Sequence, residues 1–109
     1  MVTHLGSTAT LKIILAETAT DGHEPTKTGA ELLGQVGSTS FGVWEAEPGT
    51  IVNAPAAAEA FVVVSGKATI CSDGGDPVTA VAGDMLLLAA GETVRWQVEE
   101  TFRIAFFLM

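Results

Sequence analysis

The second half of the chain consists of short apolar runs separated by glycine-containing turns. Two of these runs, residues 59–66 and 83–91, are rich in Val, Leu or Phe, and each ends at a glycine. Val and Phe favour strands, and glycine adopts positive φ at little steric cost, so the chain can reverse there and pair again. The pattern predicts an all-β fold in which strands and tight turns close into a barrel.

Three further segments complete this pattern. Residues 67–72 lead into a turn cluster at 73–77, which holds Asp, Gly and Pro, the residue types that favour tight connections. Residues 93–99 alternate between apolar and polar positions, which indicates a strand with one buried face. We expect its inward side chains to be Val94, Trp96 and Val98. Residues 102–109 form a last apolar run, long enough for one strand of a small barrel.

The first half of the chain is less regular. Residues 11–16 form a plausible strand, whereas residues 17–40 are dominated by Thr, Gly, Glu and Ser. Only residues 30–33 suggest a helical turn. We therefore expect a long linker that covers the barrel or contacts a partner. The expected organisation is an N-terminal strand and loop arm over residues 1–38 and a barrel over 39–109, within one structural domain.

Several motifs of the barrel region together resemble the cupin family. They are the run Trp44-Glu45-Ala46-Glu47-Pro48-Gly49, the spacing of Glu59 and Gly66, the pair Gly83-Asp84, and then Gly91 and Trp96. The resemblance is narrower still to the branch of small cupins that includes ureidoglycine aminohydrolase. It covers residues 39–109 and implies a double-stranded β-helix, a jelly-roll barrel with an interior pocket.

The chain departs from the family pattern at the metal site. Cupins that bind a metal carry a His-x-His pair before the glutamate and a third His three residues after the second motif's glycine. This sequence retains only the glutamate, Glu59. Metal sites in proteins generally need three or more His or carboxylate ligands, so we expect neither a metal nor another cofactor. The positions without ligands are Val52, Asn53, Ala54, Pro55 and Val94.

The only two histidines, His4 and His23, lie outside the region of resemblance. His4 is near the N-terminus and His23 is in a polar stretch typical of a surface loop, so we expect both to be solvated. The alternative is that an N-terminal arm reaches into a partner's barrel and a histidine rebuilds the metal site there, since cupins often exchange N-terminal strands.

Glu59 is the candidate catalytic residue. Strand alternation puts it on the same side as Phe61 and Val63, and the resemblance implies that this side faces the interior. Burial without a partner would raise its pKa and make it a candidate general acid or base. The alternative is a structural role, in which Glu59 pairs with Arg95 or Arg103 or accepts a hydrogen bond from an indole N–H.

Aromatic and basic side chains complete the predicted ligand-binding set, which is Trp44, Glu59, Phe61, Trp96 and Arg103. The resemblance places a basic residue near the last strand, where Arg103 would anchor a substrate carboxylate. The alternatives are core packing for the two tryptophans and a surface salt bridge for Arg103.

The composition of the chain indicates which classes of partner it can bind. The chain has 109 residues, a formal net charge of −8 and only 5 Lys plus Arg, so it would repel nucleic acid and anionic membranes. It shows no membrane span and no signal peptide, so a cytoplasmic location is expected. The single cysteine, Cys71, excludes an internal disulfide, and we expect it to be a small buried apolar residue rather than a nucleophile.

Three classes of function fit these observations. The first is a cupin that binds a small polar metabolite in its barrel without a complete metal site. The second is a small-molecule hydrolase or isomerase that uses Glu59 as acid or base. The third is a structural or oligomerising module, which an interior sealed by Phe61, Val94 and Trp96 would favour. In each case we expect a homodimer, because the strand at residues 11–16 needs an edge to pair with.

Overall fold

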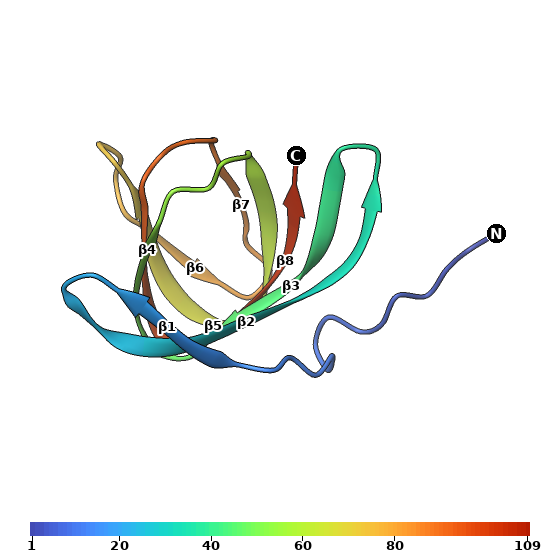
Figure 1. Ribbon diagram of the computed structural model, residues 1–109, viewed down its shortest axis with the longest axis horizontal. Helices are drawn as coiled ribbons and strands as arrows, with labels where there is room; N and C mark the ends of the chain where they lie inside the picture. Colours follow the sequence, from blue (N-terminus) through green and yellow to red (C-terminus); the bar gives the residue numbers. More distant parts are fainter.

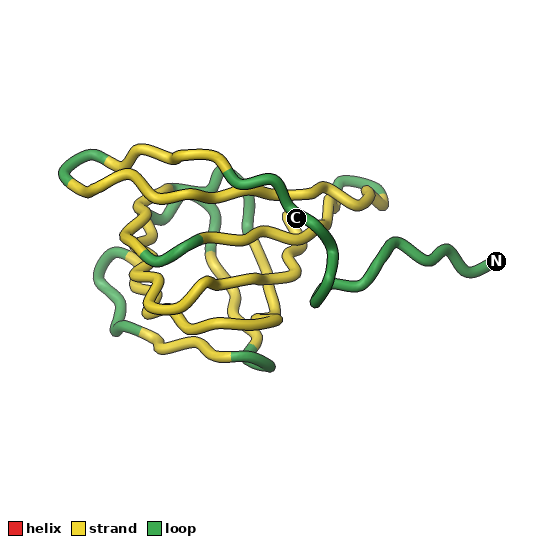
Figure 2. The backbone as a smooth tube through the Cα atoms, turned by 90° about the horizontal axis from the view of Figure 1, so that it is seen from below, coloured by secondary structure: helices red, strands yellow, loops and turns green.

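A computed structural model describes residues 1–109 and contains eight strands, with no helix (Figures 1 and 2). The strands are β1 (Ala16–Thr20), β2 (His23–Val36), β3 (Thr39–Ala46), β4 (Gly49–Asn53), β5 (Glu59–Ser72), β6 (Val78–Val81), β7 (Met85–Leu88) and β8 (Val94–Leu108). The all-β fold predicted from the sequence is confirmed. There is accordingly no helix that could cross a membrane.

One strongly curved antiparallel sheet forms the barrel. Its main strand order is β1-β2-β3-β8-β5-β6, while β4 pairs with β8, and β7 pairs with β5. Figure 1 shows the strands curling around a common interior. Strand β8 pairs with β3, β4 and β5, so it connects the two halves of the molecule.

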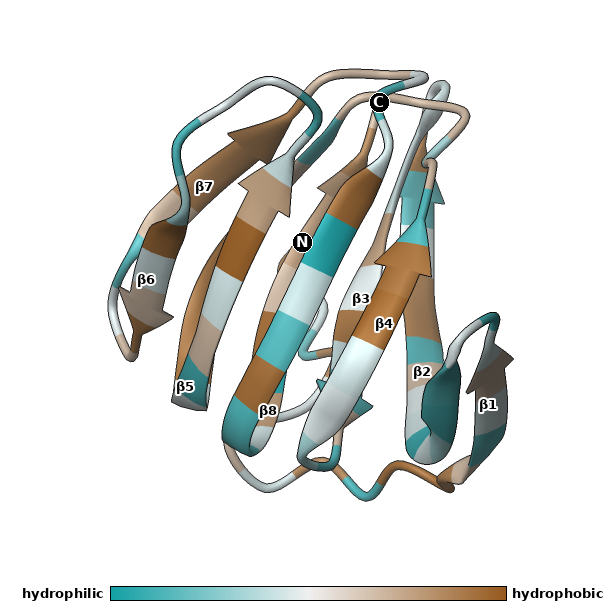
Figure 3. Cartoon of the chain, turned by 90° about the vertical axis from the view of Figure 1, so that its left-hand side faces the viewer, coloured by the Kyte–Doolittle hydropathy of each residue, from teal (hydrophilic) through white to brown (hydrophobic).

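Strand alternation sends one set of apolar side chains into the interior. The bands of contrasting hydropathy along β8 make this alternation visible (Figure 3). The expected inward residues of β8, Val94, Trp96 and Val98, are 0%, 3% and 6% exposed. From β5, Phe61 and Val63 join them, with exposures of 0% and 2%. The apolar face predicted from the sequence is therefore the core of the barrel.

Strands β5 and β8 are each longer than predicted. The sequence suggested a chain reversal at Gly66, but the residue lies within β5, where its φ is +89° and the pairing with β8 shifts register between Ser65 and Lys67. A Cβ atom there would overlap the carbonyl group of Thr101. Glycine thus allows a bulge that bends the strand rather than reversing it.

The turns expected elsewhere in the second half are confirmed. Residues 73–77 connect β5 to β6, and Gly83 (φ +94°) lies between β6 and β7. Gly91 (φ +81°) lies between β7 and β8. At these sites positive φ does reverse the chain, as the spacing of the apolar runs predicts.

The secondary structure predicted for the N-terminal half is wrong, although both histidines are exposed as expected. The segment expected as a strand, residues 11–16, is irregular except at its end, and the expected linker contains β1 and the long strand β2. The helical turn suggested at residues 30–33 belongs to β2, and His23 begins that strand rather than lying in a loop. Threonine favours strands, and the buried Thr26 hydroxyl donates to the backbone oxygens of Glu47 and Pro48.

Residues before β1 run along the outside of the sheet. Ile13 and Ile14 lie against Gly29 of β2, and the Arg103 guanidinium donates to the carbonyls of Thr8 and Leu11 at 2.9 and 2.7 Å. The residues before this tether extend away from the barrel as an arm (Figure 2), which contributes to a longest dimension of 47 Å. The arm does not enter the chain's own barrel.

Candidate functional site

A cavity of about 190 Å³ lies inside the barrel, and we call it the barrel pocket. Its lining is mostly apolar and comes from β2, β3, β4, β5 and β8. The eight lining residues are Ala30, Trp44, Asn53, Glu59, Trp96, Ile104, Phe106 and Leu108. Three of the five residues predicted for the ligand-binding set, Trp44, Glu59 and Trp96, therefore meet in this pocket.

Glu59 provides the only ionisable group of the barrel pocket. It is the first residue of β5 and lies opposite Leu108 on one side and Leu88 on the other. Burial raises the pKa of the Glu59 carboxyl above its ordinary value, because the apolar surroundings disfavour the charged form.

None of the partners considered for a structural role of Glu59 is bonded to it. The two ion pairs of the chain are Lys67–Glu99 and Arg103–Glu45. The Trp96 indole N–H donates to the Asn53 side-chain oxygen at 3.0 Å instead of to Glu59. Arg95 lies outside the barrel pocket, and Trp44 lines the pocket beside Glu59 without donating a hydrogen bond to it. The Glu59 carboxylate therefore has no bonded partner within the chain.

Two indoles form a wall of the barrel pocket. The rings of Trp44 and Trp96 have centroids 5.3 Å apart and are inclined at 50°. Asn53 fixes Trp96 through the indole hydrogen bond, and Phe61 packs against it with a centroid distance of 5.4 Å. Phe61 is fully buried and is not among the residues that line the pocket, so the structure does not bring it together with the other predicted ligand contacts. It supports Trp96 from within the core.

Arg103 does not reach the barrel pocket. It lies between the inward residues Phe102 and Ile104 on β8, so alternation turns it to the outer face. There its Nε donates to Glu45 Oε1 at 2.8 Å. The position of Arg103 therefore agrees with the salt-bridge alternative and lies away from the pocket in which a ligand contact was predicted. No basic side chain lines the pocket.

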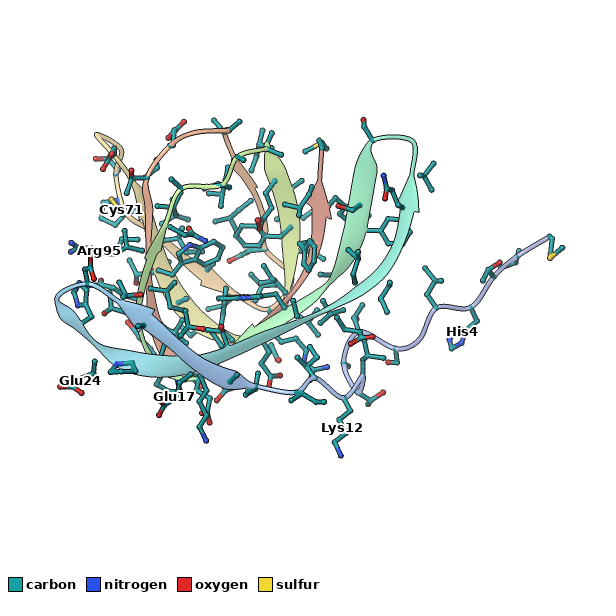
Figure 4. The ribbon with its side chains drawn as sticks, in the orientation of Figure 1. His4, Lys12, Glu17, Glu24, Cys71 and Arg95 are labelled. Atoms are coloured by element: carbon teal, nitrogen blue, oxygen red, sulfur yellow. The ribbon has the colours of Figure 1, made fainter.

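The donor atoms around the barrel pocket do not fit the metal that the cupin fold commonly holds. Glu59 is the only carboxylate or imidazole in the lining, and nowhere in the chain do three His, Cys, Asp or Glu side chains gather. His4 lies on the extended N-terminal arm, away from the barrel (Figure 4), and His23 is exposed at the start of β2. One carboxylate is too small a ligand set to hold a first-row ion.

A larger hollow of about 380 Å³ lies on the outside of the barrel, beside the 73–77 turn. Cys71 and Arg95, opposite each other on β5 and β8, both line it (Figure 4). Cys71 is half-buried on this outer face, with its thiol 3.3 Å from the carbonyl of Gly75, so the prediction of a buried core cysteine is wrong. The outer hollow is polar and does not contain Glu59, the one carboxyl whose pKa burial raises, so the barrel pocket is the stronger candidate site.

Five lining residues were not singled out from the sequence as site residues: Ala30, Asn53, Ile104, Phe106 and Leu108. The last three follow the alternation of the final apolar run, which could have identified them. Ala30 comes from the segment expected to be a linker, so no sequence signal pointed to it.

Solved structures of other proteins share this fold. The EutQ protein of Clostridium difficile superposes with a TM-score of 0.68 at 20% identity, covering 76% of this chain and 68% of that protein. A protein of unknown function from Rhizobium leguminosarum bv. viciae 3841 gives a TM-score of 0.69 at 25% identity, covering 74% and 79%. A further protein of unknown function, from Vibrio parahaemolyticus, gives 0.68 at 19% identity, covering 91% and 100%. Among curated proteins, no significant match was found.

A family model is more specific than these superpositions. The EutQ-like cupin domain matches residues 33–106, which include β3 to β7 and most of β8. The cupin resemblance of the sequence is thereby confirmed, although the match does not reach the branch of ureidoglycine aminohydrolase. The chain belongs to the family of EutQ-like cupin domains.

Proposed function

We propose that this protein binds a small polar molecule inside the barrel and does so without a metal ion. The observation that carries the proposal is Glu59, a half-buried carboxylate with no hydrogen-bond or ion-pair partner in the protein, at the wall of a mostly apolar cavity. Partial desolvation disfavours the charged form of this carboxyl, and a bound group that carries a positive charge or donates hydrogen bonds would compensate for it. Protein sites that bind small molecules commonly combine an apolar lining with a few such polar groups.

The tryptophans support the same proposal. An interior filled to its full depth would favour a purely structural module, but the pocket of about 190 Å³ leaves space beside both indoles. Asn53 and Phe61 hold Trp96 in one orientation. Ligand binding would therefore cost little entropy for ordering the Trp96 side chain, because its orientation is already fixed.

Thermal denaturation in the presence of small carboxylates, amines, ureides and sugars tests this function. A ligand at 100 times its Kd stabilises the native state by about 2.7 kcal/mol, which for a domain of this size raises Tm by about 10 °C or more. Crystals soaked with any such compound should show it beside Glu59. If no compound raises Tm or occupies the cavity, the binding function is refuted.

Catalysis is the second candidate, and the raised pKa of Glu59 favours it. A carboxyl that titrates closer to neutral pH can donate or accept protons more effectively as a general acid or base. The narrower resemblance to the branch of ureidoglycine aminohydrolase would make a hydrolase of small ureides the first activity to assay. Ammonia release that Glu59→Gln abolishes would establish it, whereas binding of ureides without turnover would argue against it.

We also propose that the protein is a homodimer, for a reason different from the one the sequence suggested. Strand β1 pairs with β2 of its own chain, so no free strand at residues 11–16 demands a partner. Instead, the outer face of β7, β5, β8 and β3 carries a row of apolar side chains in register: Leu87, Ala60, Phe107 and Phe41.

This outer row suits a second copy of the chain. Leu87 is 71% exposed, its neighbour Met85 is 76% exposed, and Phe107 is 44% exposed; Figure 3 shows β7 as apolar throughout. Exposed apolar patches commonly mark interaction surfaces. With a net charge of −8, two copies repel each other over most of their surface, whereas this row contains no charged residue. A two-fold contact through it would bury apolar area at the lowest electrostatic cost.

A further inference from the structure

The only charge that the residues lining the barrel pocket contribute is negative. Glu59 contributes a carboxylate, and every other lining residue is neutral. Arg103 is engaged with Glu45 on the outer face, and Arg95 lines the outer hollow. An anionic ligand would meet the Glu59 carboxylate without any cation to offset the repulsion, so the pocket disfavours anions.

The aromatic lining favours the opposite charge. The face of an indole carries negative electrostatic potential and attracts cations, more strongly than the other aromatic rings. Trp44 and Trp96 both line the pocket, and the planes of their rings are inclined at 50° to each other. The hydrogen bond to Asn53 holds the Trp96 ring in place. Two indoles and one carboxylate around an apolar space match the chemistry of an alkylated ammonium group.

We propose that the barrel pocket binds a small organic ammonium cation, with Glu59 as its counter-ion and the indoles of Trp44 and Trp96 as its walls. This inference rests on the proposed function and adds the chemical class of the ligand. The pocket of about 190 Å³ holds the volume of about six water molecules at ~30 Å³ each. It therefore suits a cation of about five to eight non-hydrogen atoms. The net charge of −8 also draws cations towards the protein.

Proton linkage follows from this arrangement. A cation next to Glu59 stabilises the ionised carboxylate and offsets the burial that raises its pKa. Affinity for a permanently charged cation should therefore increase as the pH rises through the raised pKa of Glu59 and then become constant. Within the pocket, β2, β3, β4 and β8 contribute no second titratable group that could produce the same profile.

Intrinsic fluorescence reports on this pocket alone. The chain has two tryptophans and no tyrosine, and both tryptophans line the pocket. The probe is choline, a quaternary ammonium alcohol whose charge does not titrate. Its matched control is 3,3-dimethylbutan-1-ol, which has the same shape with carbon in place of the charged nitrogen.

Choline and the neutral alcohol should differ clearly in their affinity for the protein. We expect choline to change the fluorescence saturably and the neutral alcohol to bind at least about tenfold more weakly, because it lacks the cation–π and counter-ion attraction. Glu59→Gln should weaken choline binding by about tenfold or more and remove its dependence on pH. Glu92→Gln, which deletes an exposed carboxylate outside the pocket, should leave both unchanged.

Each contrary result has a defined meaning. If the neutral alcohol, acetate or phosphate binds as tightly as choline, the pocket binds small molecules but the cation proposal is wrong. If choline does not alter the fluorescence while another class of compound raises Tm, the cation proposal again fails and the binding function survives. Only the absence of any response, to cationic, neutral and anionic compounds alike, overturns both.

Discussion

Replacing Arg103 with Met should destabilise the protein substantially, because this one guanidinium joins three segments of the chain. Its Nε donates to Glu45 Oε1 at 2.8 Å on β3. It also donates to the carbonyls of Thr8 and Leu11, at 2.9 and 2.7 Å, in the segment before β1. Methionine keeps an unbranched chain of similar reach but can make none of these bonds.

The size of the effect follows from the burial of the ion pair. The side chains of Arg103 and Glu45 are only 11% and 17% exposed, so water screens the pair far less than a surface pair. Removing one partner of a buried pair costs about 3–5 kcal/mol, since the other charge is left without compensation. Residual exposure reduces this figure, and the two freed carbonyls regain water. We expect a loss of about 3 kcal/mol, or a fall in Tm of about 12–20 °C.

Urea unfolding of a double-mutant cycle with Glu45→Gln measures the pair itself. Glutamine retains a neutral acceptor, so this single change should cost about 1–2 kcal/mol, and the two changes together should cost less than their sum by about 1–2 kcal/mol. Hydrogen exchange at residues 8–11 should accelerate in Arg103→Met because the tether is lost. A loss below about 1 kcal/mol with no measurable coupling would mean that the pair behaves as an ordinary surface contact.

Three shorter predictions concern the site and the assembly. Because burial raises the pKa of Glu59, the native state binds more protons than the unfolded state at pH values between the ordinary and the raised pKa. The contribution of Glu59 to the free energy of unfolding is therefore fully present below the ordinary pKa and is lost as the pH rises through the raised pKa. Urea unfolding should therefore find Glu59→Gln equal to wild type near about pH 4 and more stable near about pH 7.5, and a less stable variant at neutral pH would contradict the account. Protein purified without added metal should contain well under one equivalent of any first-row ion by elemental analysis; stoichiometric metal that survives dialysis would instead favour the enzymatic alternative. Light scattering at micromolar concentration should give twice the chain mass of 11.2 kDa, with Leu87→Lys shifting it to the monomer, whereas a monomeric wild-type protein would remove the dimer proposal.

The sequence predicts the fold well where one face of a strand is buried. In β8 the alternation of Val94, Trp96 and Val98 with polar residues identifies both the strand and its inward face, since the side-chain period of a strand is two. The same signal is weak in β2, which has one buried residue, Thr26, among fourteen. A strand exposed along most of its length needs no apolar face, so its composition cannot be distinguished from that of a loop.

The site is predictable only in part, because sequence spacing does not determine which side chains meet. Alternation grouped Glu59 with Phe61, and the cupin resemblance implied that this side faces the interior, where the pocket contains Glu59. Alternation could not show that Trp96 would find its acceptor in Asn53, 43 positions away. Nor could it show that Glu45, adjacent to Trp44, would engage Arg103 on the outer face. Those pairings depend on the register between β3, β4 and β8, which the sequence pattern leaves open.

The central place of β8 has a consequence for how the molecule folds. Its partners β3, β4 and β5 all precede it in the chain. In a nascent chain that has emerged only through β7, the edge of each of these three strands that pairs with β8 therefore has no partner. The pairing of Glu59 with Leu108 closes the barrel across a long stretch of sequence. Topologies dominated by such distant pairings fold slowly, typically within milliseconds to seconds. During synthesis the apolar faces of those three strands stay exposed to aggregation until β8 arrives.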